Sequence, residues 1–218
     1  MKTVLLVDDH PMVRKGTLAL LQTLPEAYDC LEAGSRQEAL QLLRDNPVEI
    51  AVVDLVLGGE DGLELIKEMT ALYCQLKILA LSMQPEVLYA ERVVKAGALG
   101  MVSKSEPAET VLEAFAAVAT GEIFLSRASN ALILKRLLNR KMPEGSSPVS
   151  RLSDRELHVF QLLGTGFSTA EIAETLRLSI KTIETHREKI KRKLALQDAQ
   201  ELVHAAKAWV KTGQPSSV

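Results

Sequence analysis

The chain has 218 residues and a formal net charge of -2, and 47% of its residues are hydrophobic. This length exceeds a typical single domain of roughly 100 to 150 residues, so two domains are expected. The two cysteines exclude a disulfide framework or a zinc site of the usual spacing. No apolar run approaches the ~18 residues that a membrane span needs, and no secretory signal pattern opens the chain. We therefore expect a cytoplasmic protein without a membrane partner.

The charges are unevenly distributed along the chain. Residues 1–124 hold 10 Lys and Arg against 19 Asp and Glu, whereas residues 148–218 hold 11 against 8. A basic carboxyl-terminal part favours a polyanionic partner such as DNA, and an acidic amino-terminal part does not.

Short apolar runs alternate with helical patterns through the first 122 residues. The pattern predicts strands near residues 3–7, 28–33, 49–53, 77–81 and 100–102, and helices near residues 11–24, 35–44, 63–73, 86–96 and 107–120. Strict alternation of strand and helix predicts a five-stranded parallel sheet with helices on both faces. The predicted fold class of residues 1–122 is therefore α/β and doubly wound.

The rest of the chain has helical patterns only. Residues 123–148 are predicted to form a short amphipathic linker helix and a flexible linker rich in Pro, Gly and Ser. Residues 149–218 predict an all-α domain of four helices, in which Ser153 and Glu156 form a capping box and Ser179 caps the third helix. The domain boundaries are thus expected near residues 122 and 148.

Acidic side chains follow two of the predicted strands. Asp8 and Asp9 end the run 4–7, and Asp54 ends the run 50–53. Because parallel strands bring their carboxyl ends to one edge of the sheet, these carboxylates should share a pocket. Like charges in one pocket repel, and a divalent cation with oxygen ligands, most simply Mg²⁺, relieves that repulsion. Ser82 and Lys104 follow the next two strands and supply a hydroxyl and an ammonium for a phosphoryl group.

The helix predicted from Ser179 to Leu194 has an apolar and a charged face. Ile190 and Leu194 lie within ~20° of Ile183 around the helix axis. The opposite side carries Lys181, Thr185, Glu188 and Arg192, with Glu184 beside them. A preceding short helix makes this pair a candidate helix-turn-helix, whose exposed stripe enters the major groove.

The spacing of Asp8, Asp9, Asp54, Ser82 and Lys104 resembles the receiver domain of bacterial two-component response regulators, and residues 152–210 resemble the LuxR-type helix-turn-helix. Together they are similar to the NarL/FixJ family. The resemblance implies that Asp54 accepts a phosphoryl group from a partner sensor histidine kinase. It implies that Asp9, Asp54 and the backbone carbonyl of Val56 hold Mg²⁺ while Asp8 acts through water.

The resemblance also assigns the contacts to DNA. Glu184, Thr185 and Glu188 align with the base-reading positions of the family. Lys181 belongs to the same exposed stripe, and the basic run Lys189, Lys191, Arg192 and Lys193 would pair with phosphates. The family binds DNA as a homodimer when active, through the last helix; Trp209 could serve that contact or lie wholly in the core. The implied function is a phosphorylation-controlled, sequence-specific transcription regulator.

The chain departs from the family at the switch. Gly58 stands where a proline is usual, which predicts a looser loop, and Met101 stands where an aromatic switch residue is usual. Met83, after Ser82, enlarges a position that is often small. Met101 and Gly58 leave open a regulator that works without phosphorylation. A third alternative, from a different class, is a protein-interaction adaptor whose helix-turn-helix no longer binds DNA.

His10 lies beside the acids and could join a metal site or relay a phosphoryl group, but entry into the first helix beside Pro11 is the simpler role. Hydrolases of the haloacid dehalogenase type place a second aspartate two positions after the nucleophile, and Val56 stands there. We therefore expect no turnover of external substrates, only the domain's own phosphorylation and dephosphorylation.

Overall fold

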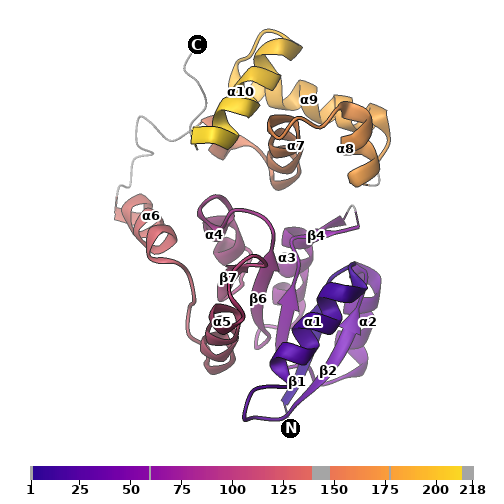
Figure 1. The fold of residues 1–218 in the computed structure, drawn as a ribbon, viewed down its shortest axis with the longest axis vertical. Helices are drawn as coiled ribbons and strands as arrows, with labels where there is room; N and C mark the ends of the chain where they lie inside the picture. The colour runs from indigo at the N-terminus through magenta and orange to yellow at the C-terminus, as the bar shows by residue number, and fades with distance from the viewer. Residues whose placement is uncertain (1, 59, 139–147, 177, 213–218) are drawn as a thin grey trace. The chain divides into compact units, whose positions relative to one another are not determined.

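The computed structural model describes residues 2–58, 60–138, 148–176 and 178–212. The chain forms two compact units, residues 1–138 and residues 139–218 (Figure 1). The division falls inside the segment that the sequence predicts as a linker. Among the helices that are described, none is long and apolar enough to cross a membrane.

A parallel five-stranded sheet forms the centre of the first unit. Its strands are β1 (Lys2–Val7), β2 (Tyr28–Ala33), β3 (Ile50–Val53), β6 (Lys77–Ser82) and β7 (Gly100–Ser103). They lie in the order β2-β1-β3-β6-β7, and every neighbouring pair is parallel. The connecting helices are α1 (Pro11–Leu21), α2 (Arg36–Asp45), α3 (Gly62–Leu72), α4 (Glu86–Lys95) and α5 (Ala108–Thr120). The predicted doubly wound α/β fold is confirmed.

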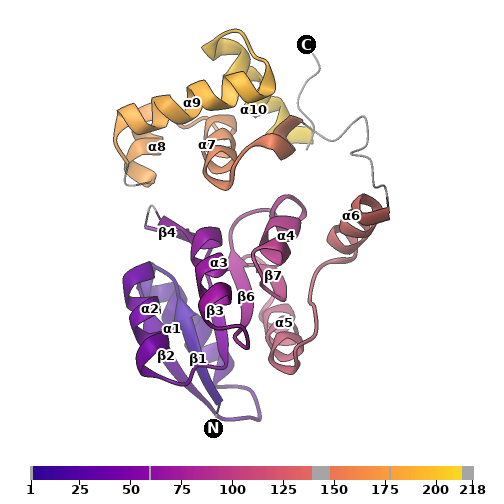
Figure 2. The same cartoon turned by 180° about the vertical axis from the view of Figure 1, so that it is seen from behind.

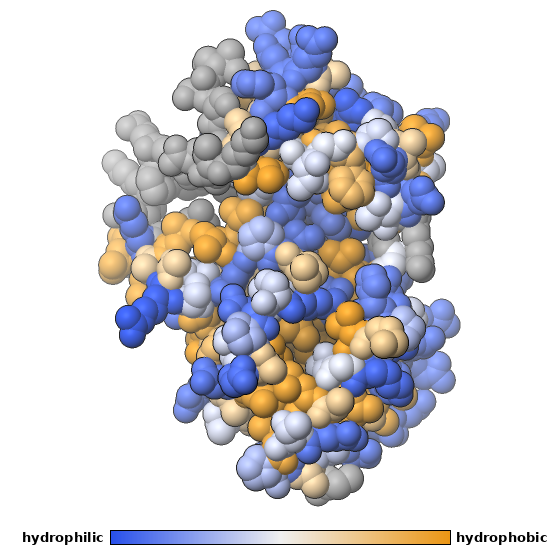
Figure 3. All heavy atoms as spheres, viewed as in Figure 1, coloured by the Kyte–Doolittle hydropathy of each residue, from blue (hydrophilic) through white to orange (hydrophobic). Residues whose placement is uncertain are grey.

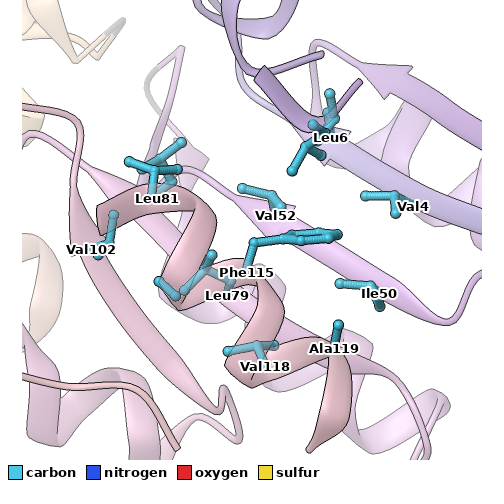
Figure 4. Close-up of a cluster of buried hydrophobic side chains, with 13 residues drawn as sticks. Val4, Leu6, Ile50, Val52, Leu79, Leu81, Val102, Phe115, Val118 and Ala119 are labelled. Atoms are coloured by element: carbon cyan, nitrogen blue, oxygen red, sulfur yellow. The ribbon is translucent and has the colours of Figure 1, made fainter. Parts of the chain in front are cut away.

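One face of this sheet packs against α1 and α5. Alternate residues of the strands, such as Leu6 and Val52, surround Phe115 of α5, which is fully buried (Figure 4). Tyr28 at the start of β2 contacts the ring of Phe115 edge to face, with centroids 5.1 Å apart. The intervening strand residues, such as Leu5 and Ala51, are equally buried on the other face. Both faces are therefore covered, as the continuous apolar runs of the strands predict.

A small hairpin follows Asp54. It consists of β4 (Val56–Leu57) and β5 (Glu60–Asp61), which pair antiparallel, and Gly58 has a φ of 53° at the turn. The backbone N–H of Arg36 donates to Glu60 Oε2 at 3.0 Å, so the hairpin is tied to the start of α2. The sequence pattern predicted a loop here; the run is too short to show the alternation by which a strand is recognised.

The predicted linker helix is α6 (Arg127–Leu138), and it packs against α4 within the first unit (Figure 2). The backbone N–H of Ser126 donates to Glu86 Oε1 of α4 at 2.7 Å, and Ser129 is buried. Leu134 and Leu138 of α6 are exposed. Figure 3 shows hydrophobic residues beside hydrophilic ones on the surface of the protein.

The second unit is all-α. A short 3-10 turn, η1 (Pro148–Arg151), precedes α7 (Asp154–Gly164), α8 (Thr169–Thr175), α9 (Ile180–Leu194) and α10 (Ala199–Thr212). The capping box of Ser153 and Glu156 is present, and Ser168 with Glu171 forms a second one that the sequence analysis did not identify. Ser179 caps α9 by accepting from Thr182, as predicted.

Close packing of α7 against α10 holds this unit together. Trp209 is buried and lies 5.6 Å from Phe160, centroid to centroid. A Cβ at Gly164 would lie only 2.4 Å from the carbonyl oxygen of Ala206, so only glycine allows this approach of the two helices. The alternative that Trp209 belongs to the core is therefore the one that the structure supports.

Candidate functional site

The sheet brings the predicted acidic and basic residues to one edge. Backbone hydrogen bonds continue the strand ladders one residue beyond the strands, from Asp54 N to Val7 O at 2.9 Å and from Lys104 N to Ser82 O at 3.0 Å. Asp8 N likewise donates to Ala33 O at 3.1 Å. The regular pairing of the apolar strands thus determines the backbone position of each functional residue.

Asp8, Asp54 and Lys104 meet in this pocket. Lys104 Nζ donates to Asp54 Oδ2 at 2.7 Å and to Asp8 Oδ2 at 2.5 Å, and all three side chains are nearly buried. Burial raises the pKa of Asp54 above its usual value, and the opposing effect of Lys104 does not cancel it. Burial lowers the pKa of Lys104, but Asp54 and Asp8 raise it by more, so it lies above its usual value. The ammonium therefore stays charged, and one such charge does not fully offset the pair of carboxylates.

Asp9 and His10 complete an acidic cluster that can hold a metal ion. One ligand atom from each of Asp8, Asp9, His10 and Asp54 lies within 4.8 Å of the others. Asp9 Oδ1 is buried and accepts no hydrogen bond from the described residues, although His10 Nδ1 lies 2.9 Å away. A buried carboxylate oxygen without a donor is costly unless a cation approaches it. The residues present therefore fit a divalent cation with oxygen ligands.

The remaining predicted site residues lie just after β3, in β6, in β7 and at the start of α1. Val56 N donates to Asp54 Oδ1 at 3.2 Å, which orients the carboxylate. Ser82 is buried at the end of β6, and its Oγ accepts from Gln84 N at 3.4 Å. Met101 is fully buried in β7. His10 is the N-cap residue of α1 ahead of Pro11, which is the simpler of the two roles considered for it.

Two residues that support the pocket were missed by the sequence analysis. Arg14 Nη1 donates to the backbone carbonyl of Asp8 at 2.5 Å, which fixes the turn that carries the acids. Gly62 lies under Asp54: a Cβ there would stand 2.1 Å from Asp54 O and 2.6 Å from Leu55 Cα. The pair Asp61-Gly62, a helix N-cap followed by a residue without a side chain, was the available signal for this close approach.

The exposed face of α9 carries the residues predicted to read DNA. Ile183 and Ile190 are fully buried, so the core direction assumed for the helix is correct. The residues of the predicted stripe are all exposed: Lys181, Glu184, Thr185, Glu188 and Arg192. Lys189 of the basic run is exposed as well. This places polar side chains along one side of the second helix of a helix-turn-helix.

Two lysines of the basic run have partners within the protein. Lys193 Nζ lies 2.5 Å from Oε2 of Glu156, a buried carboxylate in the capping box of α7. Lys191 Nζ lies 2.8 Å from Glu188 Oε1 on the exposed face. Lys193 thus has a structural role in the unit, and its contact with a phosphate stays a prediction. Lys189 and Arg192 are the members of the basic run that are exposed.

Comparison with known proteins decides the family. Residues 4–116 match the family described as the response regulator receiver domain, and residues 150–206 match the bacterial regulatory proteins of the luxR family. The chain is a response regulator with a LuxR-type helix-turn-helix domain. The expected class, a transcription regulator controlled through its receiver domain, is confirmed.

Relatives of this response regulator are similar over nearly their whole length. The Fimbriae Z protein of Salmonella typhimurium is 34% identical over 206 residues, which cover 94% of this chain and 96% of the relative. The response regulator UvrY of Escherichia coli is 31% identical over 207 residues, or 94% of each chain.

A solved structure resembles the response regulator as well. It shows RcsB from Salmonella enterica serovar Typhimurium bound to the promoter rprA in the presence of the phosphomimetic BeF3-. The similarity has a TM-score of 0.61 at 25% identity and covers 95% of this chain and 100% of that one.

Proposed function

We propose that this response regulator accepts a phosphoryl group on Asp54 from a partner histidine kinase in the cytoplasm and then binds DNA as a homodimer. The observation that carries the proposal is the junction of Asp8, Asp54 and Lys104 at the carboxyl edge of the sheet. A carboxylate attacks phosphorus only where cations offset the repulsion between the two negative groups. The pocket supplies one such cation permanently.

Each pocket residue has a distinct part in the transfer. A carboxylate oxygen of Asp54 forms the new bond to phosphorus, while the bond to the donor breaks and its electron pair leaves with the donor group. The ammonium of Lys104 and the hydroxyl of Ser82 bind phosphoryl oxygens. Val56 N, which already donates to Asp54 Oδ1, holds the carboxylate in its orientation.

Mg²⁺ is the ion that we propose for the acidic cluster. Asp9, Asp54 and the backbone carbonyl of Val56 would hold it, with Asp8 acting through water, and the ion would supply charge neutralisation at the phosphoryl oxygens. The buried Oδ1 of Asp9, which accepts no hydrogen bond from the described residues, supports this assignment. Since the residues transfer only this one group to Asp54, we propose no turnover of other substrates.

DNA binding is proposed for the exposed face of α9. Glu184, Thr185 and Glu188 would meet base edges, with Lys181 beside them, and Lys189 and Arg192 would meet phosphates. Acids on a groove-facing helix accept from cytosine N4 and are repelled by phosphates, so they favour selectivity over affinity. The promoter complex of RcsB, a protein similar over the whole chain, supports this proposal.

Treatment of the purified chain with a small phosphodonor tests both halves of the proposal. In the presence of Mg²⁺, the wild type should gain the mass of one phosphoryl group, form more dimer and bind duplex DNA more tightly. The variant Asp54→Ala should show none of the three changes. Labelling of Asp54→Ala at the wild-type level would show that another residue is the acceptor.

A further inference from the structure

Arg187 joins the two helices of the DNA-binding motif. It lies in α9, and its side chain is only 15% exposed. Its Nη1 donates to the hydroxyl of Thr169, the first residue of α8, and to Glu184 Oε1 at 3.3 Å. Glu184 itself is half exposed, on the side of α9 that would face the groove. One guanidinium group therefore connects a groove-facing carboxylate to the neighbouring helix.

A glutamate in this position is poorly suited to read DNA without support. Its side chain is among those that lose the most rotamer freedom when they are fixed. Its charge is also repelled by the phosphates on either side of the groove. The ion pair with Arg187 reduces both effects, because it restricts the carboxylate and neutralises part of its charge. Arg187 occupies Oε1 only, so the second oxygen of the carboxylate can accept from a base.

The burial of Arg187 argues against a direct contact with phosphate. Cations that bind the DNA backbone present their charged ends to solvent, as Lys189 on the same helix does. Arg187 Nη1 instead donates to two partners within the motif, Thr169 and Glu184. A planar guanidinium with several donors suits such bridging better than an ammonium.

We propose that Arg187 is a positioning residue for base recognition: anchored by Thr169, it holds Glu184 in the orientation that accepts a hydrogen bond from the N4 amino group of cytosine. This inference rests on the proposed function, since it requires that α9 reads DNA. It adds that selectivity depends on a side chain that touches neither base nor phosphate.

The test compares site preference and salt dependence in the full-length protein. The probes are a duplex that the wild type selects from a randomised pool and a scrambled duplex of the same composition. Site preference is the ratio of the two dissociation constants, and the salt slope comes from titrations at several ionic strengths. The variants are Glu184→Ala, Arg187→Ala, the double variant, Thr169→Val, and Lys189→Ala as the matched loss of one exposed cation.

The positioning role has a specific signature. Glu184→Ala and Arg187→Ala should each lower the site preference about tenfold. The double variant should lose no more than the single ones, because both remove one interaction. Thr169→Val should lose preference in the same direction. Arg187→Ala should keep the wild-type salt slope, whereas Lys189→Ala should lower the slope by about one unit and keep the preference.

Other outcomes overturn the proposal at different points. If Arg187→Ala lowers the salt slope and keeps the preference, Arg187 is itself a phosphate contact. If the losses of the single variants add in the double variant, the two residues act separately. If Glu184→Ala keeps its preference, Glu184 is not a reader and the positioning role falls with it, while DNA binding stands. A wild type that binds no duplex at all refutes the proposed function.

Thermal melts of each variant separate a loss of contact from a loss of fold. Arg187 is largely buried, so Arg187→Ala is the variant with the greatest risk of misfolding. Thr169→Val removes only a hydroxyl and keeps the shape of the side chain. An unchanged site preference in Thr169→Val would overturn the anchoring role even if Arg187→Ala does not fold.

Discussion

Asp54 carries a charge that the fold does not favour, and this gives a prediction about stability. Its pKa is raised above the usual value of 3.8, chiefly by burial. A group with a raised pKa contributes to the stability of the folded protein while it is protonated. This contribution is fully present below the usual pKa and is lost as the pH rises through the raised pKa. Without metal and near neutral pH, Asp54→Asn should therefore be at least as stable as the wild type to denaturant. The difference should narrow as the pH falls toward 3.8.

Magnesium should reverse this order. An ion at a hundred times its dissociation constant stabilises the protein that binds it by about 2.7 kcal/mol, and the variant lacks one ligand. Unfolding curves with and without Mg²⁺ measure both effects. A wild type that is more stable than Asp54→Asn without any metal would show that Lys104 more than compensates for the burial of Asp54.

Gly62 gives a second prediction at the scale of single residues. A Cβ at this position meets backbone atoms of Asp54 and Leu55, which cannot rotate away. Gly62→Ala should thus lower the free energy of unfolding by about 1–3 kcal/mol and slow the labelling of Asp54 by a phosphodonor. Gly16→Ala is the control, since a Cβ at Gly16 of α1 meets nothing within 4 Å. That variant should gain about 0.5–1 kcal/mol and label normally; equal behaviour of the two variants would contradict the steric account.

The residues of the pocket differ in how far the sequence reveals them. Asp8, Asp54 and Lys104 could be predicted because Asp8 and Asp54 directly follow apolar runs and Lys104 lies two residues past one. Parallel strands bring such positions together. Arg14 could not, because nothing in an amphipathic helix indicates which side chain reaches a carbonyl of another segment. The same holds for Lys193: its position in a basic run predicts a phosphate contact, and only the packing of α9 against α7 shows that it neutralises Glu156.

The ion pair of Lys193 and Glu156 connects two helices, and its loss should affect the stability of the unit. Lys193→Ala leaves a buried carboxylate without its cation, which should cost about 1–3 kcal/mol in the free energy of unfolding. Lys189→Ala, the loss of an exposed lysine of the same helix, should change it by less than about 0.5 kcal/mol. The salt slope of DNA binding should fall in Lys189→Ala and stay unchanged in Lys193→Ala.

At low pH, the wild type should no longer have a larger free energy of unfolding than Lys193→Ala. Burial raises the pKa of Glu156, but Lys193 and the N–H of Ser153 lower it by more, so it lies below the usual value of 4.5. A carboxylate of this kind contributes stability that is present above 4.5 and is lost as the pH falls through its lowered folded-state pKa. Denaturant unfolding over this range should show the two proteins converging. A constant difference between them would mean that Lys193 acts by packing and not by charge.

At the scale of elements, the sequence predicts what local signals determine. Helix starts at Ser153 and Ser179 were predictable because a hydroxyl capping backbone N–H groups is a short-range interaction. The hairpin β4–β5 was not, because a pair of two-residue strands is held by tertiary contacts such as that of Glu60 with Arg36 N. The packing of α6 against α4 could not be predicted either, because the hydrophobic pattern of a helix shows that it has an apolar face and not which element packs against that face.

The molecule as a whole combines an acidic unit that receives a signal with a basic unit that contacts DNA, and Met101 bears on how strongly the two are coupled. The family resemblance implies an aromatic switch residue at this position, whereas Met101 has a flexible side chain that is fully buried in β7. A side chain without two distinct positions couples phosphorylation of Asp54 more weakly to dimer formation and DNA binding. We therefore expect measurable dimer formation and DNA binding before phosphorylation, with a modest gain after it. Duplex binding of the wild type with and without phosphodonor measures the gain, and Asp54→Ala gives the baseline. A gain of a hundredfold or more, which corresponds to about 2.7 kcal/mol of coupling, would show that methionine serves as a full switch residue in this fold.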